Sequence, residues 1–239
     1  MQMAAVSEQK SGFKAGIKAG ISIAVGYLPV ALTFGLLAKT TGLTLFESVL
    51  MSLLVFAGAA QYISLSLIAA GAGAAVIIFN TFIVNIRHFL MSASLNEKME
   101  PETRAKKSLY AFGLTDETFT VIATREGKTT TGFALGVMLI AYGSWVVNTG
   151  IGHVIGASLP EFLQQAMSIA LYAMFVGLLV PSLKKEMKVA YLAGLAAVLN
   201  SMFTLTGLLD TGWAIAASTL ISAMAVEVLT GLRKGAALK

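Results

Sequence analysis

The sequence contains no cysteine and only two histidines among its 239 residues. The absence of cysteine excludes disulfide bonds, thiolate catalysis and cysteine-ligated metal sites. Two histidines without any thiol also argue against a zinc site, because such sites take several His and Cys ligands. We therefore expect neither a metal nor another cofactor.

Charged residues are also scarce. They make up 12% of the chain, whereas soluble domains carry about 25%. Hydrophobic residues make up 56%, and the mean hydropathy is +0.80. So few charges cannot cover a water-facing surface, so the expected solvent is lipid. The apolar stretches leave no room for a soluble domain, and we predict one transmembrane domain over residues 1–239.

Long apolar segments recur along the whole chain, and several reach the roughly 20 residues that a transmembrane helix needs. Their hydrophobic runs are continuous rather than alternating, which favours helices over a β-barrel. The sequence therefore predicts an all-α, polytopic membrane bundle of about seven to eight segments with broken or re-entrant helices. The segments are 16–38, 45–70, 74–94, 109–124, 131–152, 161–181, 187–208 and 212–232.

Basic residues cluster between the apolar segments, where the positive-inside rule predicts cytoplasmic loops. The net charge of +5 is thus interpreted as a topology signal rather than as a nucleic-acid-binding surface. The clusters lie in 96–107, 125–130, 182–188 and the C-terminus. If both ends of segment 109–124 are inside, this short, polar segment cannot cross. We interpret it as broken, re-entrant or cavity-lining, the alternative being a full crossing with one basic turn outside.

The same count leaves the side of the N-terminus open. Lysines near the start favour the inside, but three plain crossings would then place the basic loop 96–107 outside. Either the N-terminus is outside, or one early segment does not span. Residues 16–94 and 131–208 also each contain three apolar segments, which suggests a three-helix repeat of the kind that builds many transporters. The alternative is that helices rich in small residues resemble one another.

Gly26 and Pro29 lie inside the first apolar segment. Proline removes a backbone hydrogen bond and clashes with the preceding turn, and a neighbouring glycine eases a break. Broken helices expose backbone groups that transporters use to hold substrates. We therefore predict Gly26 and Pro29 as part of a substrate-binding site, with a tolerated kink as the alternative.

Gly58 and Gln61 lie in the run Phe56–Tyr62, in the middle of the second segment. Small residues such as Gly58 let helices approach closely. The amide of Gln61 at membrane depth must find a hydrogen-bonding partner. We predict that both residues contribute to substrate binding, and the alternative for Gln61 is an interhelical hydrogen bond.

Asn85, Arg87 and His88 lie together in the third segment. An arginine in the membrane is costly and normally faces a cavity or a partner. The planar fork of Arg87 suits a substrate carboxylate, and we group Asn85 with it as substrate-binding. The alternative is that Arg87 lies near the cytoplasmic end and snorkels. His88 is a candidate proton carrier, because histidine titrates near neutral pH.

Asp116 and Glu117 are adjacent, so their side chains point to different faces of a helix. A carboxylate at this depth with a raised pKa is a candidate proton-coupling group. The alternatives are a salt bridge to Arg87 and a solvated loop end. No P-loop, HExxH or nucleophile-elbow motif is present, so we predict that the chain is not an enzyme.

Four runs together resemble a known family. They are Gly26-Tyr27-Leu28-Pro29 leading to Phe34–Ala38, Phe56–Gln61, Asn85–His88 and Thr115–Glu117. In this order they resemble the AzlC family, the large subunit of branched-chain amino-acid exporters of bacteria and archaea. The likeness covers nearly the whole chain, although the second half matches only in hydrophobicity and length.

The resemblance implies a multi-pass plasma-membrane protein that exports leucine, isoleucine, valine and methionine. It also implies a small hydrophobic partner subunit of the AzlD type. The polar residues inside the apolar segments favour a secondary transporter that exchanges its substrate with protons. The alternative is a scaffold or channel-like subunit whose partner forms the substrate path.

Overall fold

In the described part of the computed structural model, the apolar runs become helices, as the sequence predicts. The structure describes residues 2–155 and 187–237, and between them only residues 158, 160, 162, 169, 176, 179, 180, 183 and 184. The predicted segment 161–181 and part of the loop 182–188 therefore lie outside the described residues. The number of segments and the three-helix repeat stay predictions.

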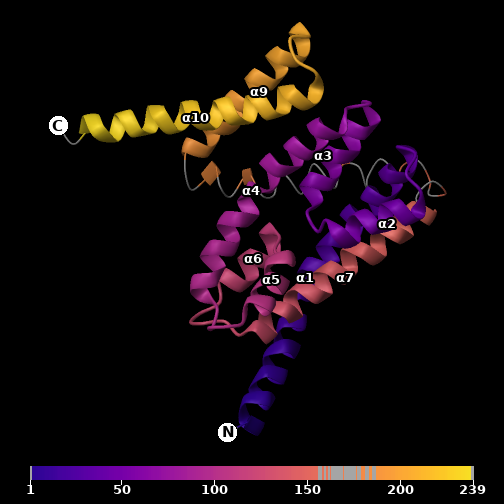
Figure 1. The fold of residues 1–239 in the computed structure, drawn as a ribbon, viewed down its shortest axis with the longest axis vertical. Helices are drawn as coiled ribbons and strands as arrows, with labels where there is room; N and C mark the ends of the chain where they lie inside the picture. Colours follow the sequence, from indigo (N-terminus) through magenta and orange to yellow (C-terminus); the bar gives the residue numbers. More distant parts are fainter. Residues whose placement is uncertain are drawn as a thin grey trace. The chain divides into compact units, whose positions relative to one another are not determined.

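The described helices differ widely in length. They are α1 (Gln2–Thr40), α2 (Leu45–Leu54), α3 (Gly58–Ala69), α4 (Ala74–Lys98), α5 (Arg104–Phe112), α6 (Asp116–Ala123), α7 (Thr131–Ile155), α9 (Met187–Thr206) and α10 (Thr211–Ala237) (Figure 1). Among them, five stretches are long and apolar enough to cross a membrane. These are Gly12–Thr40, Ala74–Lys98, Thr131–Ile155, Met187–Thr206 and Gly212–Thr230.

The chain divides into two compact units. The first unit contains Met1–Tyr62 and Val84–Ala170, and the second contains Ile63–Ile83 and Leu171–Lys239. In the second unit, α9 and α10 are joined through Gly207, whose φ of +64° suits glycine. The ring of Trp213 in α10 lies 5.5 Å from that of Phe79 in α4, between centroids.

Helices α1 and α7 form the core of the first unit and run side by side in the same direction (Figure 1). A methyl group added to Gly16 would lie 2.1 Å from the carbonyl oxygen of Phe133. At the other end, one added to Gly35 would lie 2.1 Å from the carbonyl oxygen of Thr149. Only glycine permits such close contact between the two backbones. Because the helices are parallel, both begin at the same end of the first unit.

The break expected at Gly26 and Pro29 is absent, because α1 continues through Pro29. Proline leaves the carbonyl of Val25 without its helical donor. Nearby hydroxyl groups strengthen the same turn: Ser144 donates to the carbonyl of Ala24 at 2.6 Å, and Thr33 to that of Pro29 at 2.9 Å.

The break occurs instead within 45–70, which the sequence predicts as one segment. The structure divides it into α2 and α3, with Val55, Phe56 and Ala57 between them. Helix α2 begins at a capping box formed by Thr44 and Glu47, which satisfies its first backbone donors. The prediction of a single segment over 45–70 is therefore wrong. Side chains of α7 support the gap between α2 and α3, and hydropathy alone cannot reveal such support.

Segment 109–124 is broken, as predicted. It contains parts of α5 and α6, which have nine and eight residues and are therefore only roughly 12–14 Å long. Neither crosses a hydrocarbon core of about 30 Å. The ammonium group of Lys98 donates to the carbonyl of Ala123 at the end of α6. The backbone carbonyl of Lys98 also accepts a hydrogen bond from the N–H of Thr129, just before α7. The end of α6 therefore lies near the beginning of α7. Neither helix is among the five described stretches that are long and apolar enough to cross a membrane, and whether the segment crosses as a whole stays a prediction.

Candidate functional site

Tyr27 lies where the two helix breaks of the first unit meet, near the middle of the span Gly12–Thr40. The centroid of its ring is 6.2 Å from that of Phe56, in the break between α2 and α3. Its hydroxyl donates to Glu117 Oε2 at 2.6 Å and lies 2.7 Å from Thr115 Oγ1, in the break between α5 and α6. One buried side chain thus contacts both breaks.

Thr115 fixes the beginning of α6 and thereby the two carboxylates that follow it. It is the N-cap residue, and its side chain accepts from the backbone N–H of Thr118 while the Thr118 side chain accepts from the N–H of Thr115. This reciprocal pair satisfies donors that a helix end leaves free. Asp116 and Glu117 occupy the first turn, where the helix dipole favours negative charge.

Arg87 and Asp116 form an ion pair between α4 and α6. Arg87 lies about 20 Å along α4 from Ala74 and about 16 Å from Lys98, so it is close to the middle of the helix. Of the alternatives given for these residues, the structure contains the salt bridge between Asp116 and Arg87. It does not place Arg87 at the end of α4, as snorkelling would require. Burial raises the pKa of Asp116 above its ordinary value, and the Arg87 guanidinium opposes this shift.

The two adjacent carboxylates bond different partners, as their spacing predicts. Asp116 pairs with Arg87, and Glu117 accepts from Tyr27. The ion pair is partly open, since 38% of the Arg87 side chain and 27% of the Asp116 side chain remain exposed. The group therefore combines a cation, two acids and a hydroxyl at the tip of a broken segment.

Asn85 and His88 form no described hydrogen bond with the ion pair, although the charges of Arg87 and Asp116 act on His88. Asn85 lies two residues before Arg87, roughly 200° around the helix axis, so the two side chains do not face one point. His88 Nδ1 lies 3.3 Å from the carbonyl oxygen of Asn85, within the same helix. Asn85 Oδ1 and Arg87 Nε are buried without a hydrogen-bonding partner among the described residues. Each retains the capacity to bind a further polar group.

Gln61 is fully buried and joins three helices across the first break. Its Nε2 donates to Ser52 Oγ in α2 at 3.0 Å, and its Oε1 accepts from Trp145 Nε1 in α7 at 2.8 Å. Ser52 Oγ is also 2.9 Å from Thr149 Oγ1. Gln61 therefore forms the interhelical hydrogen bonds that the sequence predicts as its alternative role. Direct contact between Gln61 and a substrate stays a prediction.

The glycines of the predicted site lie in different surroundings. A methyl group on Gly58 would lie 2.9 Å from the Trp145 ring, whereas one on Gly26 would meet nothing within 4 Å. Gly58 is therefore needed for close packing at the first break. Gly26 is exposed and lies on a different side of α1 from the buried Tyr27.

Sequence reasoning missed three residues that organise the site: Tyr27, Trp145 and Ser52. Tyr27 stands in the run Gly26–Pro29. An aromatic residue in an apolar segment usually serves to pack helices together, and the sequence does not reveal that its hydroxyl bonds a distant carboxylate. Trp145 and Ser52 take their importance from Gln61, which is distant from Trp145 in sequence. Among the described residues, no group of three His, Cys, Asp or Glu side chains could hold a metal ion.

A model of the AzlC protein family matches residues 22–159. The chain is 33% identical over 198 residues to an uncharacterized membrane protein of Archaeoglobus fulgidus, covering 81% of this chain and 87% of that protein. It is 29% identical over 187 residues to the inner membrane protein YgaZ of Escherichia coli, covering 75% and 76%.

It is also 24% identical over 201 residues to the branched-chain amino acid transport protein AzlC of Bacillus subtilis, covering 82% of this chain and 78% of that protein. No solved structure matches the chain. Several of the relatives are named membrane proteins, and five described helices can span a membrane. The chain is therefore a multi-pass membrane protein.

Proposed function

Because the chain belongs to the AzlC family, we propose that it is the large subunit of a secondary transporter. In this proposal it exports leucine, isoleucine, valine and methionine in exchange for protons, together with a small hydrophobic AzlD-type subunit. The name of the Bacillus subtilis relative supports the class of substrate. The observation that carries the mechanism is the Arg87–Asp116 ion pair at the tip of a broken segment.

In the proposed membrane topology, α5 and α6 form a re-entrant segment. It enters from the side on which α7 begins and reaches the middle of the bilayer at Thr115 and Tyr27. The α2–α3 break reaches Tyr27 as well, through Phe56. Transporters place substrate sites at midplane breaks of this kind, where charges and backbone groups are held away from bulk water.

Proton exchange follows from competition for one carboxylate. The Arg87 guanidinium suits the carboxylate of an amino-acid substrate, and the Asp116 carboxylate suits its ammonium group. A proton on Asp116 removes the charge that holds the ammonium group and expels the substrate, whereas loss of that proton restores the binding site, so proton and substrate bind in turn. Glu117 is the weaker candidate for this step, because its carboxylate already accepts a hydrogen bond from the Tyr27 hydroxyl.

The test is leucine movement in proteoliposomes that contain this chain and its small partner subunit. A pH gradient should drive movement, and the Asp116→Asn variant should exchange leucine at a rate independent of the gradient. Arg87→Ala should lower the rate about tenfold or more, because one charge-assisted contact to the substrate is lost. Glu126→Gln is the matched control, since Glu126 is exposed in the turn before α7.

Two results would contradict this proposal in different ways. If Asp116→Asn responds to the pH gradient as the unmodified protein does, the proton-coupling role is wrong. If changes at Arg87, Asp116 and Gln61 all leave transport unaltered in folded protein, the substrate path lies in the partner, and this chain is the scaffold or channel-like subunit.

A further inference from the structure

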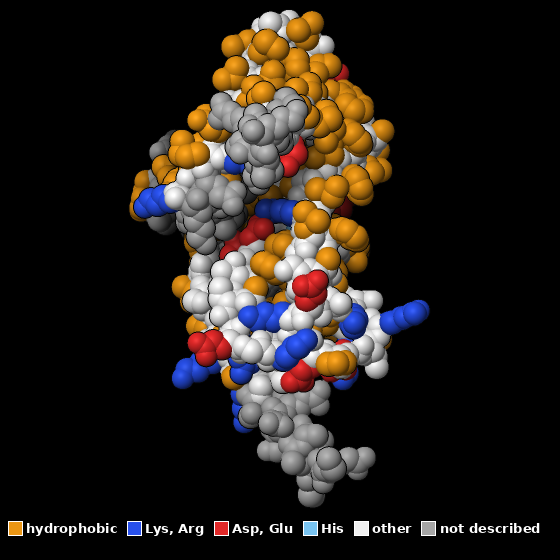
Figure 2. Space-filling model, turned by 90° about the vertical axis from the view of Figure 1, so that its left-hand side faces the viewer, with side chains coloured by type: hydrophobic (Ala, Val, Ile, Leu, Met, Phe, Trp, Pro, Cys, Tyr) orange, Lys and Arg blue, Asp and Glu red, His pale blue; other side chains and the backbone are white. Residues whose placement is uncertain are grey.

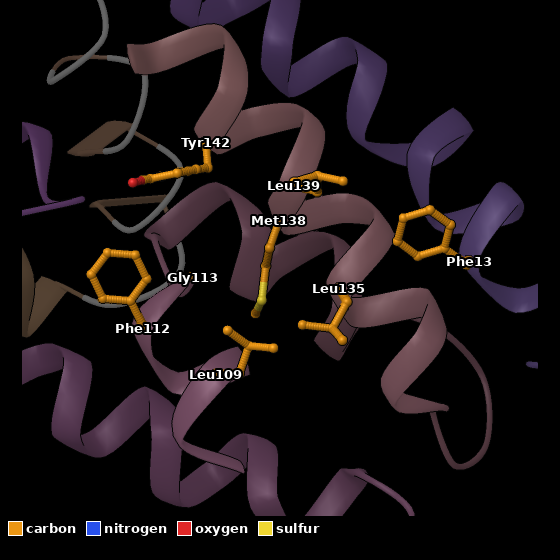
Figure 3. Close-up of a pocket in the computed structure, with 8 residues that line it drawn as sticks. All are labelled: Phe13, Leu109, Phe112, Gly113, Leu135, Met138, Leu139 and Tyr142. Carbon is orange, nitrogen blue, oxygen red and sulfur yellow. The ribbon is translucent and has the colours of Figure 1, made fainter. Parts of the chain in front are cut away.

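An apolar pocket of about 330 Å³ lies between α1, α5 and α7 in the first unit. Its walls include Phe13 from α1, Leu109 and Phe112 from α5, and Leu135, Met138 and Tyr142 from α7 (Figure 3). In Figure 3, Met138 points into the centre of the group, and Phe13 and Phe112 lie on opposite sides of it.

The chemistry of the pocket does not suit a free amino acid. The hydroxyl of Tyr142 is the one polar side-chain group among its lining residues, and it donates to the carbonyl of Leu53 at 2.8 Å. A zwitterion would leave its charged groups unpaired there, at a large cost. The pocket is also open, since Leu109 is 56% and Leu139 is 55% exposed. In a membrane protein such an opening faces lipid chains.

The depth of the pocket matches one leaflet. Its α7 residues extend from Leu135 to Tyr142, and Tyr142 is eleven residues from the first residue of α7, Thr131. Eleven residues of helix rise about 17 Å, which is close to half of a hydrocarbon core of about 30 Å. The pocket thus belongs to the leaflet whose headgroups surround the beginning of α7.

The beginning of α7 is also the basic end of the first unit. Basic side chains there are Lys14, Lys18, Lys98, Arg104, Lys106, Lys107, Arg125 and Lys128, and acidic ones are Glu97, Glu100, Glu102 and Glu126. In Figure 2, charged side chains gather in a band across the lower part of the view. At the opposite end of α1 and α7, the described charged residues are Lys39 and Glu47, whose charges cancel. Positive charge is therefore in excess only at the end that adjoins the pocket.

Two of these bases are placed to reach a group at the mouth of the pocket. Lys14 is exposed and follows Phe13, and Arg104 is exposed at the first residue of α5, ahead of Leu109 and Phe112. Neither forms an ion pair with a described side chain, whereas Lys106 pairs with Glu102. Their long, flexible side chains can extend toward the headgroup layer.

We propose that this pocket and the two bases bind an anionic phospholipid. One acyl chain occupies the apolar pocket, and the phosphate group lies beside Lys14 and Arg104. Anionic lipids are concentrated in the cytoplasmic leaflet, and the positive-inside rule places this end of the protein there. The site is separate from the Arg87–Asp116 pair and does not depend on the proposed transport function.

Native mass spectrometry of the purified full chain tests the site. The probes are phosphatidylglycerol and phosphatidylcholine with identical acyl chains. We expect one phosphatidylglycerol to bind about tenfold more tightly than phosphatidylcholine, and Lys14→Gln with Arg104→Gln to abolish that preference. Lys39→Gln removes one charge from the far end of α1 and should preserve it.

A second variant tests the acyl-chain pocket. Leu139→Trp adds bulk at an exposed lining position, so it should fill the pocket without disturbing the core, and tight binding of one lipid should be lost. Leu205→Trp in α9, at a position 86% exposed, is the control. Equal binding of both lipids, unaffected by the charge variants, would overturn the proposal. Loss of leucine binding in Leu139→Trp with unchanged lipid binding would instead assign the pocket to the substrate.

Discussion

The two helix breaks in the first unit are held by different chemistry. At the α2–α3 break, a neutral amide, an indole and two hydroxyls bond one another, and Gln61, Ser52 and Thr149 are completely buried. At the α5–α6 break, the bonds run between charged groups that remain partly exposed, Arg87 and Asp116.

This difference separates a fixed element from one that can change state. Neutral hydrogen bonds in a buried network have no second protonation state near neutral pH, so the first break has one stable arrangement. Carboxylates gain and lose protons, and each change alters which partner is favoured. We therefore expect substitutions at the first break to affect stability mainly, and substitutions at the second to affect transport mainly.

Gln61→Ala should give the largest effect on stability. It removes the hydrogen-bonding partner of Trp145 and one of the partners of Ser52, and it leaves a cavity. We expect a loss of about 3 kcal/mol in the free energy of unfolding, measured by thermal unfolding in detergent. Asn148→Ala is the matched control, because the described bonds of its amide stay within α7. Equal losses in both variants would show that the network does not hold the break.

A pair of glycine substitutions ranks next. Gly58→Ala places a methyl group 2.9 Å from the Trp145 ring, and the ring must shift at a cost of about 1–3 kcal/mol. Gly26→Ala meets nothing within 4 Å and replaces glycine inside a helix, so it should be neutral or stabilise by up to about 1 kcal/mol. Melting temperatures of the two variants give the comparison. A destabilising Gly26→Ala would indicate that a partner or substrate approaches α1 there.

Tyr27→Phe tests the residue that contacts both breaks. The ring keeps its packing, with its centroid 5.2 Å from that of Trp145, but the bonds to Glu117 and Thr115 are lost. We expect a loss of about 1 kcal/mol in stability and a lower rate of leucine transport, because α6 loses its hydrogen bonds to α1. An unaltered rate would show that this contact does not position the Arg87–Asp116 pair.

Asp116→Asn should have the smallest effect on stability and a large effect on transport. Because the ion pair is partly exposed, its loss should cost no more than about 1 kcal/mol. The raised pKa of Asp116 means that it takes up a proton at a higher pH than an ordinary aspartate. Leucine efflux by the unmodified protein should therefore fall as the external pH rises through that pKa, because fewer protons then bind Asp116 to displace the substrate, and the variant should show a flat profile. A stability loss as large as that of Gln61→Ala would show that the two breaks do not differ in their contribution to stability.

Some of the site follows from residue types alone. An arginine and an aspartate in apolar surroundings must find partners, and a salt bridge between Arg87 and Asp116 is among the arrangements that the sequence predicts. The polar composition and basic flanks of segment 109–124 likewise predict a break. Proline misleads in α1, since a membrane helix can continue through it, and the sequence alone does not show whether the packed helices allow this.

Hydropathy and charge, which depend on composition and local order, determined that this chain is helical and lies in a membrane. They did not determine on which side α1 begins, because counting crossings requires knowledge of which segments span. The parallel contact of α1 with α7 shows only that the two helices begin at the same end of the first unit, and the division of 45–70 into α2 and α3 shows that this early segment is not one helix. Only tertiary structure could also bring Tyr27 to Glu117, since a hydroxyl and a carboxylate 90 positions apart meet through helix packing.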